Sequence, residues 1–208
     1  MKQWLKISLP GFFLGFAILI VSVFRTAAVR HEFSGDIPER QVLDNASASI
    51  NYSLAYPGSV LPDSPLWWLK AGRDKLWLTI TTNPDRKAEL MLLFADKRLN
   101  MAMVLFDKGN FELGFSTLSK AEKYLEAAAF LEEENRRNGS DTSEFLKVLA
   151  IASLKHREVI ESLIAKAPEG ASPFMASVGD YSKNSFESAM HGLNEKGIPV
   201  PESPFDTE

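Results

Sequence analysis

Residues 84–108 read PDRKAELMLLFADKRLNMAMVLFDK, and this stretch decides the fold class. Apolar residues recur in it three and four positions apart, at Ala88, Leu92, Ala95, Leu99, Ala102, Met103 and Phe106. That spacing predicts an amphipathic helix with one face turned toward a core. Asn83 before Pro84 is a typical N-cap, and Gly109 follows where the helix should stop.

The chain on both sides of this helix carries the same signals. Ser64-Pro65 and Ser172-Pro173 each place a capping side chain before a proline, and Gly139 and Gly197 are typical helix stops. With the apolar spacing, these signals predict helices over 65–81, 84–108, 111–137, 143–166 and 173–195. Short connections make sequential helices antiparallel neighbours. We therefore predict an all-α fold, with a soluble antiparallel bundle of about five helices over residues 64–196.

Residues 1–30 are predicted to be a membrane anchor. The run 7–24 holds eighteen residues without a charge, and it is followed by Arg25 and Arg30. As a helix it would be about 27 Å long, close to the thickness of a bilayer's hydrocarbon layer. A cleavable signal peptide is the alternative, because small residues at 26–28 offer a cleavage site.

The orientation and association of this anchor follow from the same segment. An N-terminal signal-anchor before a long domain usually exports that domain, which predicts a single-pass protein of the cell membrane with an extracytoplasmic bundle. Gly11 and Gly15 form a Gly-xxx-Gly pair, a pattern that lets two membrane helices approach closely. The anchor could therefore support a homodimer.

Two segments lack a helical period. Residues 31–63 mix Ser, Asn, Pro and Gly with scattered apolar residues, which predicts a linker with a short extended piece in it. In the tail, 197–208, prolines recur and rule out a helix or a central strand. The tail is expected to be extended, either as a loose C-terminus or as a strip that lies along the bundle or binds a partner.

Composition excludes several classes of function. The 208 residues include no cysteine, which rules out disulfides, thiol nucleophiles and cysteine-ligated metals. The net charge of −4 is uneven: residues 64–108 hold eight basic and five acidic groups, whereas 109–208 hold ten and seventeen. A basic proximal part would orient the domain toward an anionic membrane. No stretch is basic enough for nucleic acid, so we expect none as a partner.

The first helix of the bundle carries the candidate membrane-surface residues Trp67, Trp68, Lys70 and Arg73. Adjacent residues lie about 100° apart around a helix, so the two tryptophans cannot both point at the middle of one face. One of them is therefore a candidate for the membrane interface beside the basic side chains, as in amphipathic anchoring helices. Packing of these residues in the core is the alternative.

No catalytic or metal-binding signature is present, and we expect no enzymatic activity and no cofactor. His156 continues the apolar register of its helix, which predicts a partly buried histidine bonded to a neighbour. Glu187 and His191 are four residues apart, which is ordinary helix support. With His156 they would be the first residues to consider for a metal. The run 132–134, three glutamates, is expected to be a solvated and frayed helix end.

Several motifs that occur in order resemble an uncharacterised bacterial domain family. They are PGSVLPDSPLWWLK at 57–70, NPDRKAEL at 83–90, ADKRLNMA at 95–102 and SKAEKYLE at 119–126. The resemblance covers about residues 55–128, and Trp67-Trp68 replaces the tyrosine usual in the family. It implies a bacterial, envelope-facing helical domain, usually behind a single membrane helix. It brings no activity and no functional residues.

These features together predict a non-enzymatic extracytoplasmic interaction module that is anchored to the membrane through residues 7–24 and meets an envelope protein or the membrane surface. The alternative is an envelope sensor domain that binds a small ligand or a metal.

Overall fold

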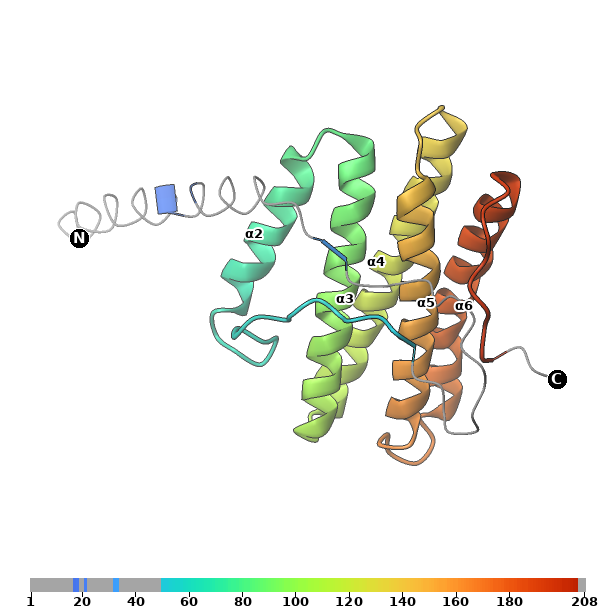
Figure 1. Ribbon diagram of the computed structural model, residues 1–208. Coiled ribbons are helices and arrows are strands. Elements are labelled where there is room, and N and C mark those ends of the chain that lie inside the picture. Colours follow the sequence, from blue (N-terminus) through green and yellow to red (C-terminus); the bar gives the residue numbers. More distant parts are fainter. Residues whose placement is uncertain (1–16, 19–20, 22–31, 34–49, 206–208) are drawn as a thin grey trace.

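The described part of the protein is entirely helical apart from its connections. The computed structural model describes residues 17–18, 21, 32–33 and 50–205. Five helices occur between residues 50 and 205, and no strand does (Figure 1). They are α2 (Trp67–Ile80), α3 (Pro84–Asp107), α4 (Phe111–Arg137), α5 (Ser143–Ile164) and α6 (Ser172–Glu195). The predicted all-α class and the predicted helices of the bundle are thereby confirmed.

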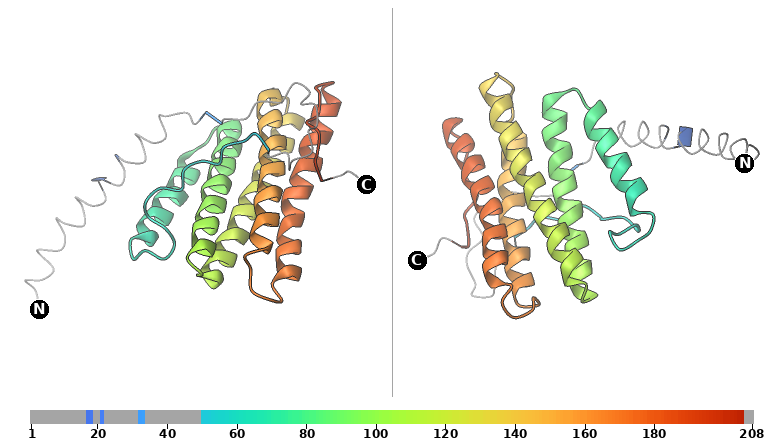
Figure 2. Two further views of the ribbon diagram at one scale, coloured as in Figure 1. Left: turned by 60° about the horizontal axis from the view of Figure 1, so that its bottom comes forward. Right: turned by 180° about the vertical axis from the view of Figure 1, so that it is seen from behind.

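Helices α3 to α6 form the bundle, and α2 lies at its edge. Helix α3 packs along α4, α5 packs along α6, and α4 also packs on α6. Within the described part of the chain, α3 is the only helix that α2 packs against. The view from behind shows α2 at one side of the molecule, beside α3 (Figure 2). One face of α2 therefore has no neighbour among the described helices.

The helix ends follow most of the sequence signals. The Asn83 side chain accepts a hydrogen bond from the Arg86 N–H at 2.8 Å, and Gly109 has φ +71° just after α3. Ser64 and Ser172, which were predicted as N-caps, do not occupy that position. Helix α6 already includes Ser172, and α2 begins only at Trp67, because the Ser64 hydroxyl accepts from the Leu66 N–H in a turn before the helix.

Three apolar clusters fill the molecule. The predicted core positions of α3 are buried, with Leu99 fully so, except Met103, which is only partly buried. Gly114 of α4 is required for the close approach to α3, since a Cβ there would lie 2.7 Å from the Phe106 ring. A smaller cluster under α2 contains Ala55, Trp77, Leu90, Leu93 and Phe94.

Residues 50–63, which we call the strap, cross the front of α3 and α5 as extended chain (Figure 1). Tyr52 and Ala55 are 5% exposed, and the Ile50 N–H donates to Glu158 Oε2 at 3.1 Å. Within the predicted linker over 31–63, residues 50–63 are extended, and they pack on the bundle as an element of the fold. Within the remainder, residues 31 and 34–49 lie outside the described residues.

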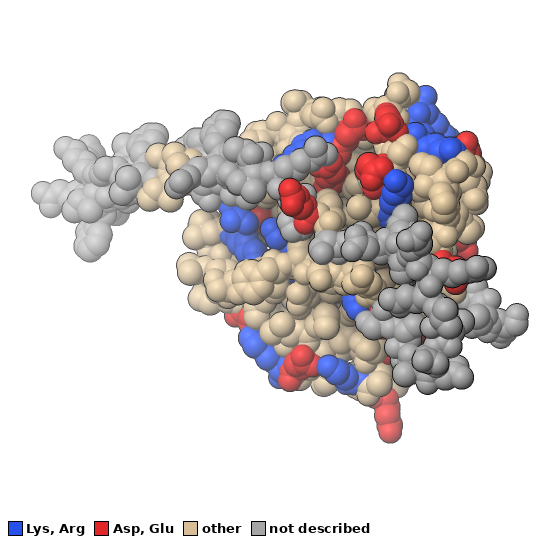
Figure 3. Space-filling view, viewed as in Figure 1, with Lys and Arg blue, Asp and Glu red and all other residues tan. Residues whose placement is uncertain are grey.

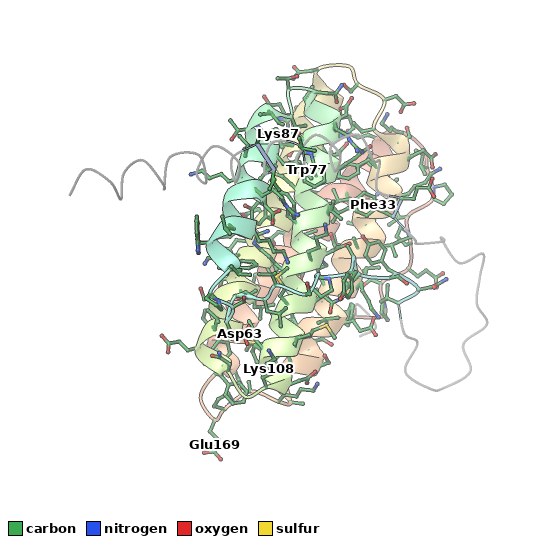
Figure 4. All side chains as sticks on the ribbon, turned by 90° about the vertical axis from the view of Figure 1, so that its left-hand side faces the viewer. Phe33, Asp63, Trp77, Lys87, Lys108 and Glu169 are labelled. Atoms are coloured by element: carbon green, nitrogen blue, oxygen red, sulfur yellow. The ribbon has the colours of Figure 1, made fainter. Side chains whose placement is uncertain are left out.

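The strap ends in a turn that encloses a lysine. The Lys70 ammonium donates to the carbonyls of Pro57 at 2.5 Å and Val60 at 2.9 Å. Gly58 has φ +81°, and a Cβ there would lie 3.3 Å from Lys70 Nζ. Farther along, Asp63 accepts from Lys108 at 2.8 Å, and the two side chains lie together in Figure 4. The motif at 57–70 is thus a closed local structure.

The tail packs along the bundle. Pro201 is buried, and the partly buried Ile198, Val200 and Phe205 pack against the core. The Arg157 guanidinium lies 4.3 Å from the centroid of the Phe205 ring. Residues 198–205 therefore lie along the bundle and are not a loose end, and binding of a partner by this segment stays a prediction. Residues 206–208 lie outside the described part.

The predicted anchor falls largely outside the described residues. None of the described helices is long and apolar enough to cross a membrane. The run 7–24, with Gly11 and Gly15, lies outside the described residues except at 17, 18 and 21. The anchor and its association stay predictions.

Leu99→Ala should lower the free energy of unfolding by about 2–5 kcal/mol, because it leaves a cavity among fully buried neighbours. Phe130→Ala is the matched control, because Phe130 is 65% exposed on α4 and its loss should change stability by less than about 0.5 kcal/mol. Urea unfolding of the full chain in detergent micelles measures both. Equal midpoints for the two variants would mean that the core of α3 is misplaced.

Candidate functional site

A charged network lies at the centre of the bundle. His156 of α5 is fully buried, and its ring bridges two carboxylates that are fully buried as well. Nδ1 lies 2.7 Å from Glu122 Oε1 of α4, and Nε2 lies 3.2 Å from Asp96 Oδ1 of α3. One side chain from each of three helices therefore meets at a single point.

The strap adds a fourth component to this network. The Tyr52 hydroxyl donates to Asp96 Oδ2 at 2.8 Å, and the Ala55 N–H donates to the same oxygen at 3.4 Å. Asp96 therefore connects the strap to α5 through His156. Glu122 Oε2 is buried and has no hydrogen-bond partner.

The two carboxylates determine the charge of the histidine. Burial lowers the pKa of an imidazole, but the carboxylates of Glu122 and Asp96 outweigh burial and raise the pKa of His156 to about 9. His156 is therefore an imidazolium at neutral pH. Burial, together with the Asp96 charge, raises the pKa of Tyr52 well above its ordinary value, so the phenol keeps the proton that it donates.

This arrangement limits what His156 can do chemically. In an imidazolium both ring nitrogens carry protons, and here both are committed to carboxylates. The ring then has no free lone pair for a metal or for general-base work. In the described residues no three His, Asp or Glu side chains are placed to hold a metal ion. The predicted bond from His156 to a neighbour is present, although the residue is fully and not partly buried.

The other two residues considered for a metal lie elsewhere. Glu187 is exposed on α6, and His191 is 72% exposed with Nδ1 3.3 Å from Glu195 Oε1. The structure does not bring either residue together with buried His156.

The four predicted membrane-surface residues are divided by the fold. Trp68 is 69% exposed, whereas Trp67 is half-buried with the Lys70 ammonium 5.5 Å from its ring centroid. Lys70 is held by the strap, and Arg73 NH2 contacts Asp74 Oδ1 at 2.8 Å. Of the four, only Trp68 is directed to solvent.

Trp68 is one of several exposed apolar side chains on and beside α2, and we call this group the α2 face. Its exposed members are Leu66, Trp68, Leu69 and Ile80, with Tyr56 of the strap 75% exposed beside the start of α2. Helix α2 buries only Asp74 and Trp77, and Figure 4 shows Trp77 on its inner side. In the space-filling view, uncharged surface over α2 forms the edge of the domain, next to basic side chains (Figure 3).

Of the three glutamates at 132–134, Glu132 departs from the predicted solvated end, whereas Glu134 is exposed as expected. Glu132 is fully buried, and its Oε1 accepts from Thr142 at 2.6 Å and from Arg136 at 3.2 Å. For Glu132 the prediction was wrong, because its Oε1 accepts from the Thr142 hydroxyl before α5 and from the Arg136 guanidinium on α4, while its Oε2 is buried with no hydrogen-bond partner among the described residues. Helix α4 continues to Arg137. The two arginines in its last turn stabilise this end of the helix through their interaction with the helix dipole.

Sequence reasoning missed the charged residues of the interior. Asp96 follows Leu92 by four positions, and Glu122 follows Leu118 by four, so both stand in the core register of their helices. A charged residue in an apolar register was the available signal. It was also present at Arg98, which is 7% exposed.

The comparisons with known proteins give one match. A family model described as "Domain of unknown function (DUF5667)" matches residues 59–170, more than half of the chain. The matched range begins in the strap and ends after α5, and it includes Asp96, Glu122 and His156. Neither the curated proteins nor the solved structures give a match.

His156→Gln should destabilise the protein at about pH 6, and the loss relative to the natural protein should shrink as the pH rises through about 9. A histidine whose pKa is raised in the folded state contributes stability below its ordinary pKa and loses it above the raised one. Across this pH range, the difference in unfolding free energy between the two proteins should shrink by about 3 kcal/mol. This follows from about 1.4 kcal/mol for each pH unit between the ordinary pKa of histidine and the raised pKa of His156. Urea unfolding of both proteins across this range measures it.

Lys70 also contributes to the pH dependence of stability, because its pKa is lowered to about 8, chiefly by burial. Comparing His156→Gln with the natural protein cancels this contribution. Lys70 titrates in the same range in both proteins and shifts stability in the opposite direction. A stability difference that stays constant with pH would show that His156 is not charged inside the bundle.

Proposed function

The chain belongs to the family of the domain of unknown function DUF5667, and from this premise we propose that it is a non-enzymatic extracytoplasmic interaction module held at the cell membrane by residues 7–24. The proposal takes the α2 face as its binding surface and the bilayer that holds the anchor as the occupant of that surface.

The observation that carries the proposal is the exposure of α2. Large apolar side chains of a domain are normally buried, and a group of them left exposed on one element is a candidate interaction site. Among the other described residues of the domain, only Phe130 and Phe174 are comparably exposed large hydrophobics. The bundle closes its own core with α3 to α6, so the outward side of α2 is not needed for that core.

The chemistry of the α2 face favours a bilayer surface. Trp and Tyr are enriched where a protein meets the membrane interface, because each has an apolar ring and a polar group. Trp68 and exposed Lys75 are seven positions apart on α2, which places them on one side of the helix. An anchor on the same chain would keep this side within reach of lipid. An envelope protein and a second copy of the chain are the other occupants that the test must separate.

Because the chain has no cysteine, a single probe can report on the α2 face. Thr79→Cys places an environment-sensitive fluorophore on the exposed side of α2, and Glu126→Cys places it on exposed α4 as the control. In the full chain reconstituted into vesicles of neutral and anionic lipid, the probe at 79 should shift to the blue and be quenched by brominated lipid. The probe at 126 should do neither.

Trp68→Ser with Leu69→Ser should abolish the shift at position 79, and Phe130→Ser should not. A signal that depends on the ratio of protein to lipid would indicate a second copy instead. A signal seen only in native membranes would indicate an envelope protein. Retention of the chain in vesicles after alkaline carbonate washing tests the anchor separately from the α2 face.

A further inference from the structure

A turn at the top of the bundle in Figure 1 joins α4 to α5. It begins at Asn138, the residue that follows α4, and continues with Gly139 at φ +90°. Both residues are exposed, and a Cβ placed on Gly139 would meet nothing within 4 Å. Of all the asparagines in the sequence, only Asn138 precedes a glycine. The turn therefore presents an accessible Asn-Gly pair to water.

An asparagine can react with the backbone that follows it. The amide nitrogen of the next residue loses its proton and attacks the side-chain Cγ, the Cγ–Nδ2 bond breaks, and ammonia leaves as a succinimide ring closes. Water then opens this ring. Cleavage between the nitrogen and Cγ gives aspartate, whereas cleavage between the nitrogen and the main-chain carbonyl carbon gives isoaspartate. Glycine offers the least hindered nitrogen for the attack, because it has no side chain and the widest backbone freedom.

We propose that Asn138 is a self-modification site, at which the folded protein loses ammonia and acquires aspartate or isoaspartate with water as the only co-reactant. The Gly139 N–H donates to the Arg136 carbonyl at 3.0 Å. Attack requires this bond to open, so that the Gly139 nitrogen can turn toward Cγ of Asn138. Hydrogen bonds at the end of a helix fray at a small cost in free energy. The turn thus restrains the attacking nitrogen only weakly.

The fold hinders the same reaction at the other described asparagines. Asn83 precedes Pro84, which has no N–H to deprotonate. Asn51 and Asn110 precede residues with bulky aromatic side chains. The asparagines that lie inside helices are each followed by a helical residue that carries a side chain, and they are Asn100, Asn135, Asn184 and Asn194. Asn138 is therefore the asparagine that both its neighbour and its place in the fold favour.

Isoaspartate at this position would disturb the contacts beneath the turn. It lengthens the main chain after residue 138 by a methylene group and adds a negative charge at the C-terminus of α4, where the helix dipole disfavours anions. The Ser140 N–H donates to the Asn135 carbonyl at 3.0 Å, and the Thr142 hydroxyl donates to Glu132 Oε1 at 2.6 Å, both across the altered segment. Glu132 is fully buried, so a weaker bond from Thr142 leaves a buried carboxylate less satisfied. Modified molecules should consequently be less stable.

The test is incubation of the full chain in detergent micelles and mildly alkaline buffer, with samples taken over several weeks. Peptide mapping by mass spectrometry follows the gain in mass when NH2 is replaced by OH, and fragmentation of the peptides distinguishes isoaspartate from aspartate. We expect conversion at Asn138 to be at least about tenfold faster than at the other asparagines of the same sample. Converted protein should have a thermal midpoint lower by at least about 2 °C.

Asn138→Gln is the matched control, because it keeps the amide but would have to close a larger ring. It should neither gain mass at position 138 nor lose thermal stability on incubation. Conversion at Asn138 that is no faster than elsewhere would overturn the proposal. So would conversion confined to protein unfolded in urea, because the folded turn would then protect the site. An unchanged midpoint in converted protein would overturn the predicted effect on Glu132. None of these measurements involves the α2 face or the anchor, so the proposed function is tested separately.

Discussion

The imidazolium of His156 between Asp96 and Glu122 is the interaction on which the arrangement of the bundle depends. Apolar packing alone tolerates small rotations and slides of one helix on another, whereas a histidine with two fixed partners does not. Placing three ionised groups in the interior is costly, and breaking such a set by removing one member typically costs about 3–5 kcal/mol. The network therefore fixes the relative positions of α3, α4 and α5, and through Tyr52 it fixes the strap.

Most of the helical architecture could be predicted from local signals. The spacing that runs from Ala88 to Phe106 reflects a periodicity that any amphipathic helix must show, and Gly109 takes a positive φ that few other residues tolerate. The strap could not be predicted in the same way. The burial of the Tyr52 hydroxyl depends on Asp96, forty-four positions later, which accepts its hydrogen bond. An extended segment carries no period that reveals such a partner.

The charged interior shows the other limit of local reasoning. Glu132 and Glu133 are identical in type and adjacent in sequence, yet Glu132 is closed to solvent and Glu133 is not. Only the position of Thr142 and Arg136 distinguishes them. For the same reason, the count of charged residues over 64–108 predicted a net positive charge for α2 and α3 but could not show that Arg98 is buried.

The strap also determines how a mechanical load would enter the domain. The strap begins at residue 50 beside α5, at mid-height of the bundle and away from the ends of the helices. A pull from the N-terminal side meets the packing of Phe33 against the core and then the Ile50–Glu158 and Tyr52–Asp96 hydrogen bonds. These bonds lie across the direction of the helices, so tension is spread over α3 and α5 together. The domain would resist stretching as a unit, and α2 would be unwound only after the strap had been stripped from the bundle.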